Sequence, residues 1–484
     1  MLFNSISFVI FLPVVFFLYW FVAKKNLRLQ NILLLVSSYF FYACWDWRFL
    51  FLLVFSTFLD YYTGLRIHEA TRQRAKTIWL WISIIINLGF LGAFKYYNFF
   101  SQSFAEGIDL LGIHTSIATL SFILPVGISF YTFHGLSYVI DLYKDRIKPE
   151  RDFINYSVFV SFFPLLVAGP IERATHLLPQ IVKPRVFDYS KATDGLRQIL
   201  WGLFKKIVIA DNCAEYANVI FNNSSDYSGS TLVVGAIFFT FQIYGDFSGY
   251  SDIALGTARL FGIDLLRNFA FPYFSRDIAE FWRRWHISLS SWFRDYVYIP
   301  LGGSKGGTWM KIRNTFIIFI LSGLWHGANW TYITWGALNA VYFLPLMLTN
   351  NNRNNIGIVA AGKSLPTVRE FFMILFTFAI TVFAWIFFRA ENIGQALEIV
   401  SEIFSMSLFA FPDFPGIHES ITIVLLLFVF MTVEWKGREH QYAIEKLGVN
   451  KSRSRRWSYY IAILFSIYLF GNFASNIEFI YFQF

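Results

Sequence analysis

Residues Leu321 to Gly336 read LSGLWHGANWTYITWG, and no charged residue occurs from Asn314 to Asn350. An apolar stretch of this length is sufficient for a pair of helices that crosses a bilayer twice. It places the imidazole of His326 at membrane depth, where a ring nitrogen loses its hydration and needs a hydrogen-bond partner or a function. The position alone leaves both explanations open: a histidine bonded to a neighbouring helix, and a functional histidine.

The rest of the chain shares this apolar character. Of 484 residues, 56% are hydrophobic, 21% are aromatic and only 15% are charged, and the mean hydropathy is +0.50. This composition is too apolar for a soluble globular protein. Runs of about 17 to 22 apolar residues recur, each long enough for a membrane-spanning helix. We therefore predict an all-α polytopic membrane protein with about 11 to 12 transmembrane helices, plus re-entrant or interfacial helices.

The charge and the cysteines exclude several other classes of protein. The formal net charge is +9, but Lys and Arg fall in short loops between apolar runs and form no basic face, so no nucleic-acid partner is expected. Cys44 and Cys213 are far apart, which argues against a disulfide framework or a cysteine metal site. The first apolar run, Ser7 to Val22, has its positive charges after it, so we expect a retained helix and no cleavable signal peptide.

The distribution of Lys and Arg predicts a topology under the positive-inside rule, with both termini outside the cytoplasm. The chain is expected to be one integral membrane domain, residues 1–484, with cytoplasmic-face helices and loops at 259–313. Residues 153–171 are apolar but interrupted by Pro164 and Pro170, which indicates a re-entrant segment or a kinked span. Other spans are predicted near 29–45, 49–64, 77–97, 119–142, 194–211, 232–247, 314–331, 333–349, 371–388 and 457–474.

A second histidine, His286, lies in the segment FWRRWHISLSSWFRDYVYIPLGG, residues 281–303. Its tryptophans and arginines suit an amphipathic helix at the membrane interface. They also suit an opening that binds an anionic phosphate-bearing donor, such as a coenzyme A thioester, because Arg pairs bidentately with phosphate. Both interpretations can hold together. The candidate donor-binding residues are Arg283, Arg284, Trp285 and Arg294, with Trp325 and Asn329 beside His326.

The stretch FQIYGDFSGYSD, residues 241–252, carries Asp246 and Asp252 next to a predicted span. Carboxylates there are unfavourable unless paired, so they are expected to form ion pairs with arginines of the following basic block or to orient a histidine. His134 is interpreted as a core histidine. No GxSxG elbow, phosphate-binding loop or HExxH motif is present, so no metal is implied.

The chain ends in the aromatic sequence NIEFIYFQF, residues 476–484. An aromatic motif at 477–484 outside the cytoplasm suits an interfacial belt. It also suits a segment that folds back into a groove and presents the hydroxyl of Tyr481 to the interior.

Several of these segments resemble one known family. WHGANWT at 325–331, WRRWHISLSSWFRDYVYIPLGG at 282–303, GDFSGYSD at 245–252, VAGPIERA at 167–174 and MLFNSISF at 1–8 are similar to the bacterial alginate O-acetyltransferase branch of the membrane-bound O-acyltransferase family. The resemblance covers nearly the whole chain. It implies the fold of that family, an essential histidine at His326 and a second histidine of the same tunnel at His286.

The resemblance also implies an activity. Such proteins take an acyl group from a cytoplasmic thioester, here acetyl-coenzyme A, and make it available for O-acylation of a cell-surface polysaccharide. The tail FIYFQF looks like a motif whose tyrosine carries the acyl group, which implies that role for Tyr481. Expected partners are membrane lipids, a polysaccharide acceptor and an extracytoplasmic SGNH-type acetyltransferase, at the bacterial inner membrane.

Two other functions remain open on the sequence. A polytopic transporter or flippase would also use broken helices and interior histidines, although no matching halves are visible. A lipid-directed acyltransferase of the same fold has the same motifs.

Overall fold

The computed structural model describes residues 1–114, 119–120, 124–473 and 479–480. These residues form two compact units: unit 1 is Met1–Ala192 with Thr257–Leu266, and unit 2 is Thr193–Gly256 with Arg267–Phe484. Across the described ranges the chain is helical and contains no strand, and seven helices are long and apolar enough to cross a membrane. The prediction of an all-α polytopic membrane protein is confirmed.

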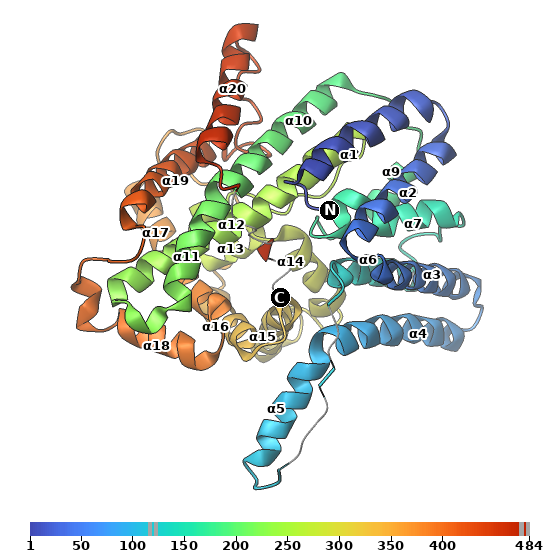
Figure 1. The fold of residues 1–484 in the computed structure, drawn as a ribbon. Coiled ribbons are helices and arrows are strands. Elements are labelled where there is room, and N and C mark those ends of the chain that lie inside the picture. The colour runs from blue at the N-terminus through green and yellow to red at the C-terminus, as the bar shows by residue number, and fades with distance from the viewer. Residues whose placement is uncertain (115–118, 121–123, 474–478, 481–484) are drawn as a thin grey trace. The chain divides into compact units, whose positions relative to one another are not determined.

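Unit 1 contains the helices from the N-terminus to α9 (Figure 1). They are α1 (Ile6–Phe17), the π-helix η1 (Leu18–Val22), α2 (Leu27–Asp46), α3 (Arg48–Glu69), α4 (Gln73–Leu91), η2 (Gly92–Tyr96), α5 (Tyr97–Asp109), α6 (Ile128–Tyr143), α7 (Phe153–Ser161), α8 (Phe163–Leu166) and α9 (Ala174–Ile181). A buried carboxylate, Asp60 of α3, accepts hydrogen bonds from Ser83 and Asn87 of α4, each at 2.7 Å. Gly135 of α6 abuts the same carboxylate, so three helices pack around it.

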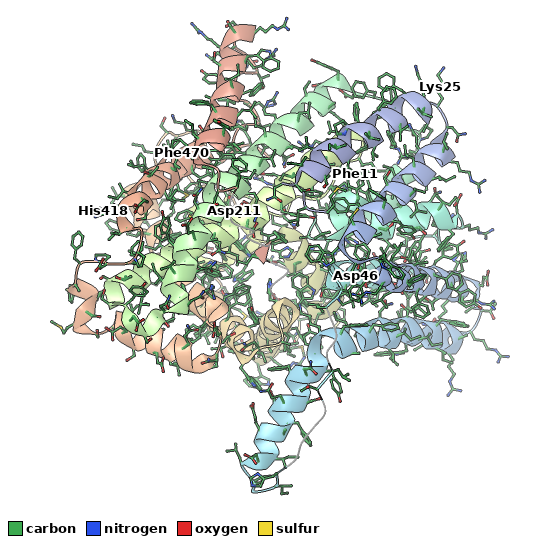
Figure 2. All side chains as sticks on the ribbon, viewed as in Figure 1. Phe11, Lys25, Asp46, Asp211, His418 and Phe470 are labelled. Carbon is green, nitrogen blue, oxygen red and sulfur yellow. The ribbon has the colours of Figure 1, made fainter. Side chains whose placement is uncertain are left out.

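Helix α2 shows how the sequence sets the ends of a span. Lys25 lies in the turn before it and Asp46 at its far end (Figure 2). The Asn26 side chain accepts a hydrogen bond from the Leu29 N–H at 3.0 Å and caps the first turn. The 20 residues of α2 extend about 30 Å, which matches the hydrocarbon thickness of a bilayer.

The proline-interrupted segment 153–171 forms two short helices. Phe162 separates α7 from α8, with φ −51° and ψ 115°, and Pro164 lies at the start of α8. The nine residues of α7 extend only about 14 Å, less than a bilayer core.

Unit 2 contains the remaining helices, of which α10 begins four residues before it. They are α10 (Tyr189–Phe204), η3 (Lys205–Ala210), α11 (Asp211–Asn222), η4 (Ser224–Asp226), α12 (Gly229–Leu260), η5 (Pro272–Phe274), α13 (Ile278–Arg284), α14 (Ile287–Phe293), η6 (Arg294–Tyr298), α15 (Gly307–His326), α16 (Trp330–Leu348), α17 (Val368–Arg389), α18 (Ile393–Ile403), η7 (Met406–Phe409), α19 (Ile417–Gly437) and α20 (Arg453–Phe470).

Two helices are longer than predicted. Helix α12 spans 32 residues instead of the expected 232–247, because Ser248 and Asp252, beyond the predicted end, bond the buried Lys205. The helix that starts with α4 continues through η2 and α5 to Asp109, although the predicted span ended near residue 97. By contrast, α2, α16 and α17 lie within three residues of the predicted spans at both ends. Helix α15 begins seven residues before the predicted span 314–331 and ends five residues before its end.

Candidate active site

The two histidines singled out in the sequence lie together in unit 2. The imidazole of His286 has its centroid 5.8 Å from the Trp325 ring, and His326 lies 5.0 Å from the same ring. His286, Trp325 and His326 are 1%, 4% and 4% exposed. One buried indole therefore contacts both imidazoles, and we call these three residues the histidine cluster.

His326 is the last residue of α15. The chain then becomes extended at Gly327, and α16 begins after Asn329, whose side chain accepts a hydrogen bond from the Thr331 N–H at 3.0 Å. The Asn329 amide also donates to the Glu391 carbonyl at 2.7 Å. Asn329, predicted to bind the donor, thus caps the helix that follows His326.

The crossing of α15 and α16 depends on two glycines. A Cβ atom at Gly323 would lie 2.2 Å from the Tyr332 carbonyl oxygen, and one at Gly336 would lie 2.4 Å from the Phe319 carbonyl oxygen. Glycine allows two helix backbones to approach closely. This close crossing brings Trp335 of α16 against His326, with 5.3 Å between ring centroids.

His286 lies between α13 and α14 in a left-handed backbone conformation, with φ 43° and ψ 54°. A non-glycine residue keeps this conformation only where its surroundings impose it. Asn268 supplies the constraint: its carbonyl accepts the Ile287 N–H at 2.9 Å, its side-chain oxygen accepts the Ser288 hydroxyl at 2.6 Å, and its amide donates to Ser251 at 3.1 Å.

The environment of His286 is apolar and aromatic. Phe247 of α12 meets its ring edge to face, with centroids 4.6 Å apart. Burial lowers the pKa of His286 to about 3. The imidazole is therefore neutral near pH 7 and carries one N–H donor and one nitrogen acceptor.

Trp285, predicted to contact the donor, belongs to the packed interior. It is 1% exposed, and its ring lies 5.5 Å from Phe281 and 5.1 Å from Trp385. Trp285 therefore anchors the chain in the interior of unit 2 directly before His286.

A cavity of about 600 Å³ opens beside α13, α14 and α15. Its apolar lining includes Phe319 and Phe343, and Ser322 lies one helical turn before His326. Four cationic side chains line the same cavity, which we call the basic pocket: Arg283, Arg294, Lys311 and Arg353.

These cations differ in how far they are already engaged. Arg283 donates to the carbonyls of Asn352 and Asn355, each at 2.9 Å, and burial lowers its pKa. Arg294 pairs with Asp295 at 2.7 Å. Neither Lys311 nor Arg353 forms an ion pair within the part of the chain that the structure describes.

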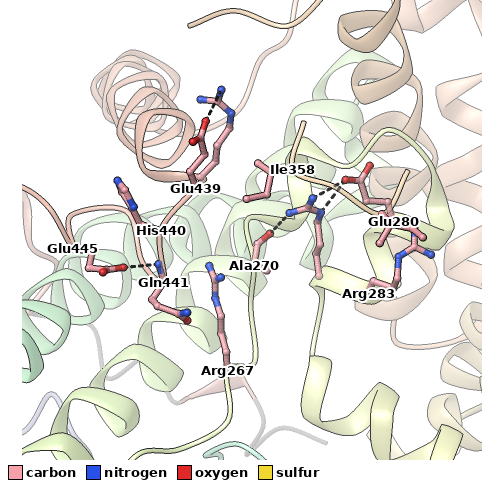
Figure 3. Close-up of a pocket in the computed structure, with 12 residues that line it drawn as sticks. Arg267, Ala270, Glu280, Arg283, Ile358, Glu439, His440, Gln441 and Glu445 are labelled. Carbon is pink, nitrogen blue, oxygen red and sulfur yellow. Dashed lines mark hydrogen bonds and ion pairs between the residues drawn. The ribbon is translucent and has the colours of Figure 1, made fainter. Parts of the chain in front are cut away.

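Arg284 lines a different cavity, of about 570 Å³ (Figure 3). It is ion-paired with Glu280 at 2.8 Å, and it donates to the Ala270 carbonyl at 3.1 Å. Arg267 extends toward Ala270 and Gln441 in the same cavity, and burial lowers its pKa. The predicted donor-binding arginines therefore form no single cluster, since Arg294 lines the basic pocket, Arg284 lines this second cavity, and Arg283 lines both.

The acidic stretch of α12 is paired, but not with the predicted partners. Asp252 lies 2.6 Å from Lys205 and Asp246 lies 2.8 Å from Lys206, instead of pairing with arginines of residues 259–313. Glu434 of α19 accepts hydrogen bonds from Tyr244 at 2.6 Å and from Trp201 at 3.0 Å. Two consecutive lysines within an apolar crossing were the available signal, because each needs a buried counter-charge.

The described end of the tail lies inside unit 2. Phe479 and Ile480 are 2% and 1% exposed, and the Phe479 ring lies 4.7 Å from Tyr250 of α12. The aromatic tail was expected either in an interfacial belt or in an interior groove, and Phe479 and Ile480 lie in the interior. Tyr481 lies outside the described residues.

Comparisons with known proteins find a matching family and several similar sequences. A profile of MBOAT, the membrane-bound O-acyltransferase family, matches residues 144–388. The chain is 37% identical over 457 residues to "Probable alginate O-acetylase AlgI" of Azotobacter vinelandii, covering 94% of this chain and 88% of that protein. It is 35% identical over 429 residues to "Peptidoglycan O-acetyltransferase" of Helicobacter pylori, covering 83% and 79%. It is also 30% identical over 229 residues to "Teichoic acid D-alanyltransferase" of Bacillus subtilis, covering 45% and 57%.

Proposed function

Because the chain belongs to the membrane-bound O-acyltransferase family and is an O-acyltransferase of many membrane-crossing helices, we propose that it moves acetyl groups from cytoplasmic acetyl-coenzyme A to a polysaccharide outside the cytoplasm. The relatives named above act on alginate and peptidoglycan or transfer D-alanine to teichoic acid, all polymers of the cell surface. The loop charges support a location in the bacterial inner membrane with both termini outside the cytoplasm.

The observation that carries this proposal is the geometry of α15. The helix lines the basic pocket at Lys311 and ends at His326 in the histidine cluster. Fifteen residues of α-helix separate these two positions, or about 22 Å. A long, thin donor with phosphates at one end and a thioester at the other suits this distance.

The donor would bind with its phosphates at the basic pocket. Lys311 and Arg353 supply cations that have no anionic partner in the described part of the chain, and Arg294 supplies a further guanidinium of the lining. The apolar wall formed by Phe319 and Phe343 suits the uncharged arm that carries the thioester. Coenzyme A would leave on the same side, so no charged group crosses the bilayer.

His326 would act as the general base. A ring nitrogen takes the proton from the acceptor hydroxyl, and the acceptor oxygen attacks the thioester carbonyl carbon. The carbon–sulfur bond breaks, the thiolate of coenzyme A leaves, and the imidazolium returns the proton to it. The products are an acetyl ester and coenzyme A.

His286 would assist from the same cluster. Its neutral imidazole has an N–H that can donate to the carbonyl oxygen as negative charge develops there. A buried donor that is already oriented needs no reorganisation during the reaction.

The acceptor would be Tyr481 or a polymer hydroxyl directly. The burial of Phe479 and Ile480 supports Tyr481 as the acceptor, because these two residues precede it directly and lie in the interior of unit 2. The acetyl group would then pass from the phenolic oxygen to the polymer, with an extracytoplasmic SGNH-type acetyltransferase as partner.

Transfer of label from acetyl-coenzyme A to the purified full-length protein tests this proposal. We expect label on the wild type, none on His326→Ala and none on Tyr481→Phe. His134→Ala is the control, since it removes another buried imidazole that the proposed chemistry does not use. Label on His326→Ala would exclude the proposed base, and label on Tyr481→Phe would assign the acceptor to another residue. Failure of every protein to take label and to release coenzyme A would contradict the proposed donor.

A further inference from the structure

The chain that follows α20 is held against η3 and α11. The Phe470 carbonyl accepts a hydrogen bond from the Asn212 amide at 2.8 Å, and the Asn472 N–H donates to the Ile207 carbonyl at 3.3 Å. Helix η3 therefore contacts the chain at Asn472, two residues after the end of α20.

The last described residue makes a specific backbone contact. The Ile480 N–H donates to the Oδ2 atom of Asp246 at 2.7 Å. Phe479 packs its ring on Tyr250, one turn further along α12, at 4.7 Å. A backbone bond and a side-chain contact together fix the register of the tail against α12.

The carboxylate that accepts this bond belongs to a buried ionic triad. The Lys206 ammonium lies 2.8 Å from Asp246 and 2.8 Å from Asp211. Lys206, Asp246 and Asp211 are 6%, 2% and 4% exposed. Two carboxylates share one ammonium, and a buried carboxylate in this position requires further hydrogen-bond donors. The Ile480 N–H is one of these donors.

We propose that Asp246 and Lys206 form a docking site for the C-terminal segment and position it for acyl transfer. Asp246 holds Ile480, and the next residue of α12, Phe247, contacts His286. The turn of α12 that holds Ile480 is therefore the turn that contacts the histidine cluster. The positioning role rests on the proposed function, whereas the docking itself does not.

A second buried pair one residue away offers a matched control. Lys205 lies 2.6 Å from Asp252 and donates to Ser248 at 3.0 Å, and Asp252 also accepts from Gln198 at 2.8 Å. The lysines are consecutive and both aspartates belong to α12. Of these two aspartates, Asp246 is the one that accepts a hydrogen bond from the tail within the described residues.

Hydrogen–deuterium exchange at the tail tests the docking without reference to activity. In full-length protein we expect the Ile480 amide to exchange at least about tenfold faster in Asp246→Leu than in the wild type. Asp252→Leu removes the other lysine-paired carboxylate of α12, whose side chain is 14% exposed against 3% for Asp246, and should leave this rate unchanged. Unchanged exchange in Asp246→Leu, or equal acceleration in both variants, would overturn the docking site.

A pair of tail variants tests the positioning and leaves the buried charges intact. Ile480→Pro removes the donor, whereas Ile480→Val retains it. We expect at least a tenfold loss of acetyl label in Ile480→Pro and wild-type labelling in Ile480→Val. Full labelling of Ile480→Pro would overturn the positioning role. Absence of label from the wild type, with the tail still protected, would instead contradict the proposed function and leave the docking supported.

Discussion

Single residues of the basic pocket differ in what their substitution would disturb. Arg283 bonds two backbone carbonyls of the loop at residues 352–355, so its removal would alter the loop as well as the charge. Lys311 and Arg353 line the same cavity and have no anionic partner in the described ranges. Their charges are therefore the more specific probes of donor binding.

We expect Lys311→Glu and Arg353→Glu each to raise the KM for acetyl-coenzyme A about tenfold, with kcat within about twofold of the wild type, because the lost contact acts equally on bound donor and transition state. Steady-state release of coenzyme A measures both constants. Lys451→Glu, the same charge change at an exposed loop residue outside the cavity, is the control. An unchanged KM in both pocket variants would place the donor phosphates elsewhere.

The residues also show how far the sequence could predict this site. The side chains around His286 and His326 are distinctive in type and spacing, and the structure brings both imidazoles to Trp325. The roles of Arg284 and Trp285 depend only partly on near neighbours. Glu280 and Phe281 lie four residues before them, whereas Ala270 and Trp385 are brought to them by the fold, which the sequence pattern does not reveal. Residue type identified a basic and aromatic segment, but tertiary contacts decide which of its side chains face a cavity.

Among the helices, α15 supplies Trp325 and His326 of the candidate site, and α16 packs Trp335 against His326. Both helices were predicted as spans because their apolar runs are uninterrupted, whereas α12 was predicted too short. Hydropathy ends the span at residue 247, between Asp246 and Asp252, although each aspartate is paired with a lysine of η3 inside one continuous helix. A charge that is paired inside the protein leaves the helix intact, and only the fold reveals the pair.

The close crossing of α15 and α16 predicts a strong effect of one methyl group. Gly336→Ala would place a Cβ 2.4 Å from the Phe319 carbonyl oxygen, so the helices must separate. We expect a loss of stability of about 1–3 kcal/mol and a fall in activity, because Trp335 would shift against His326.

Gly89→Ala is the matched control for this substitution. It lies in α4, where nothing lies within 4 Å of an added Cβ. Alanine is the better helix former there by about 1 kcal/mol, so its thermal midpoint should equal or exceed that of the wild type. Equal midpoints for Gly336→Ala and the wild type would show that the crossing tolerates separation.

At the scale of the whole molecule, the surface is that of a membrane protein. Large apolar side chains are exposed along the spans, including Phe51 at 70%, Ile85 at 63%, Phe376 at 67% and Phe428 at 74%. Exposed apolar area of this extent indicates contact with lipid. The composition predicted this surface, because polar residues are too few to cover it.

The central claim is directional: the acetyl donor reaches the histidine cluster from the cytoplasmic side, and the acetyl group leaves on the other. Membrane vesicles of defined sidedness test it most directly. With labelled acetyl-coenzyme A outside, inside-out vesicles should transfer label to protein and polymer without detergent, whereas right-side-out vesicles should do so only after permeabilisation. Neither preparation should transfer label when the protein carries His326→Ala. Equal labelling of intact vesicles of both orientations would contradict the account.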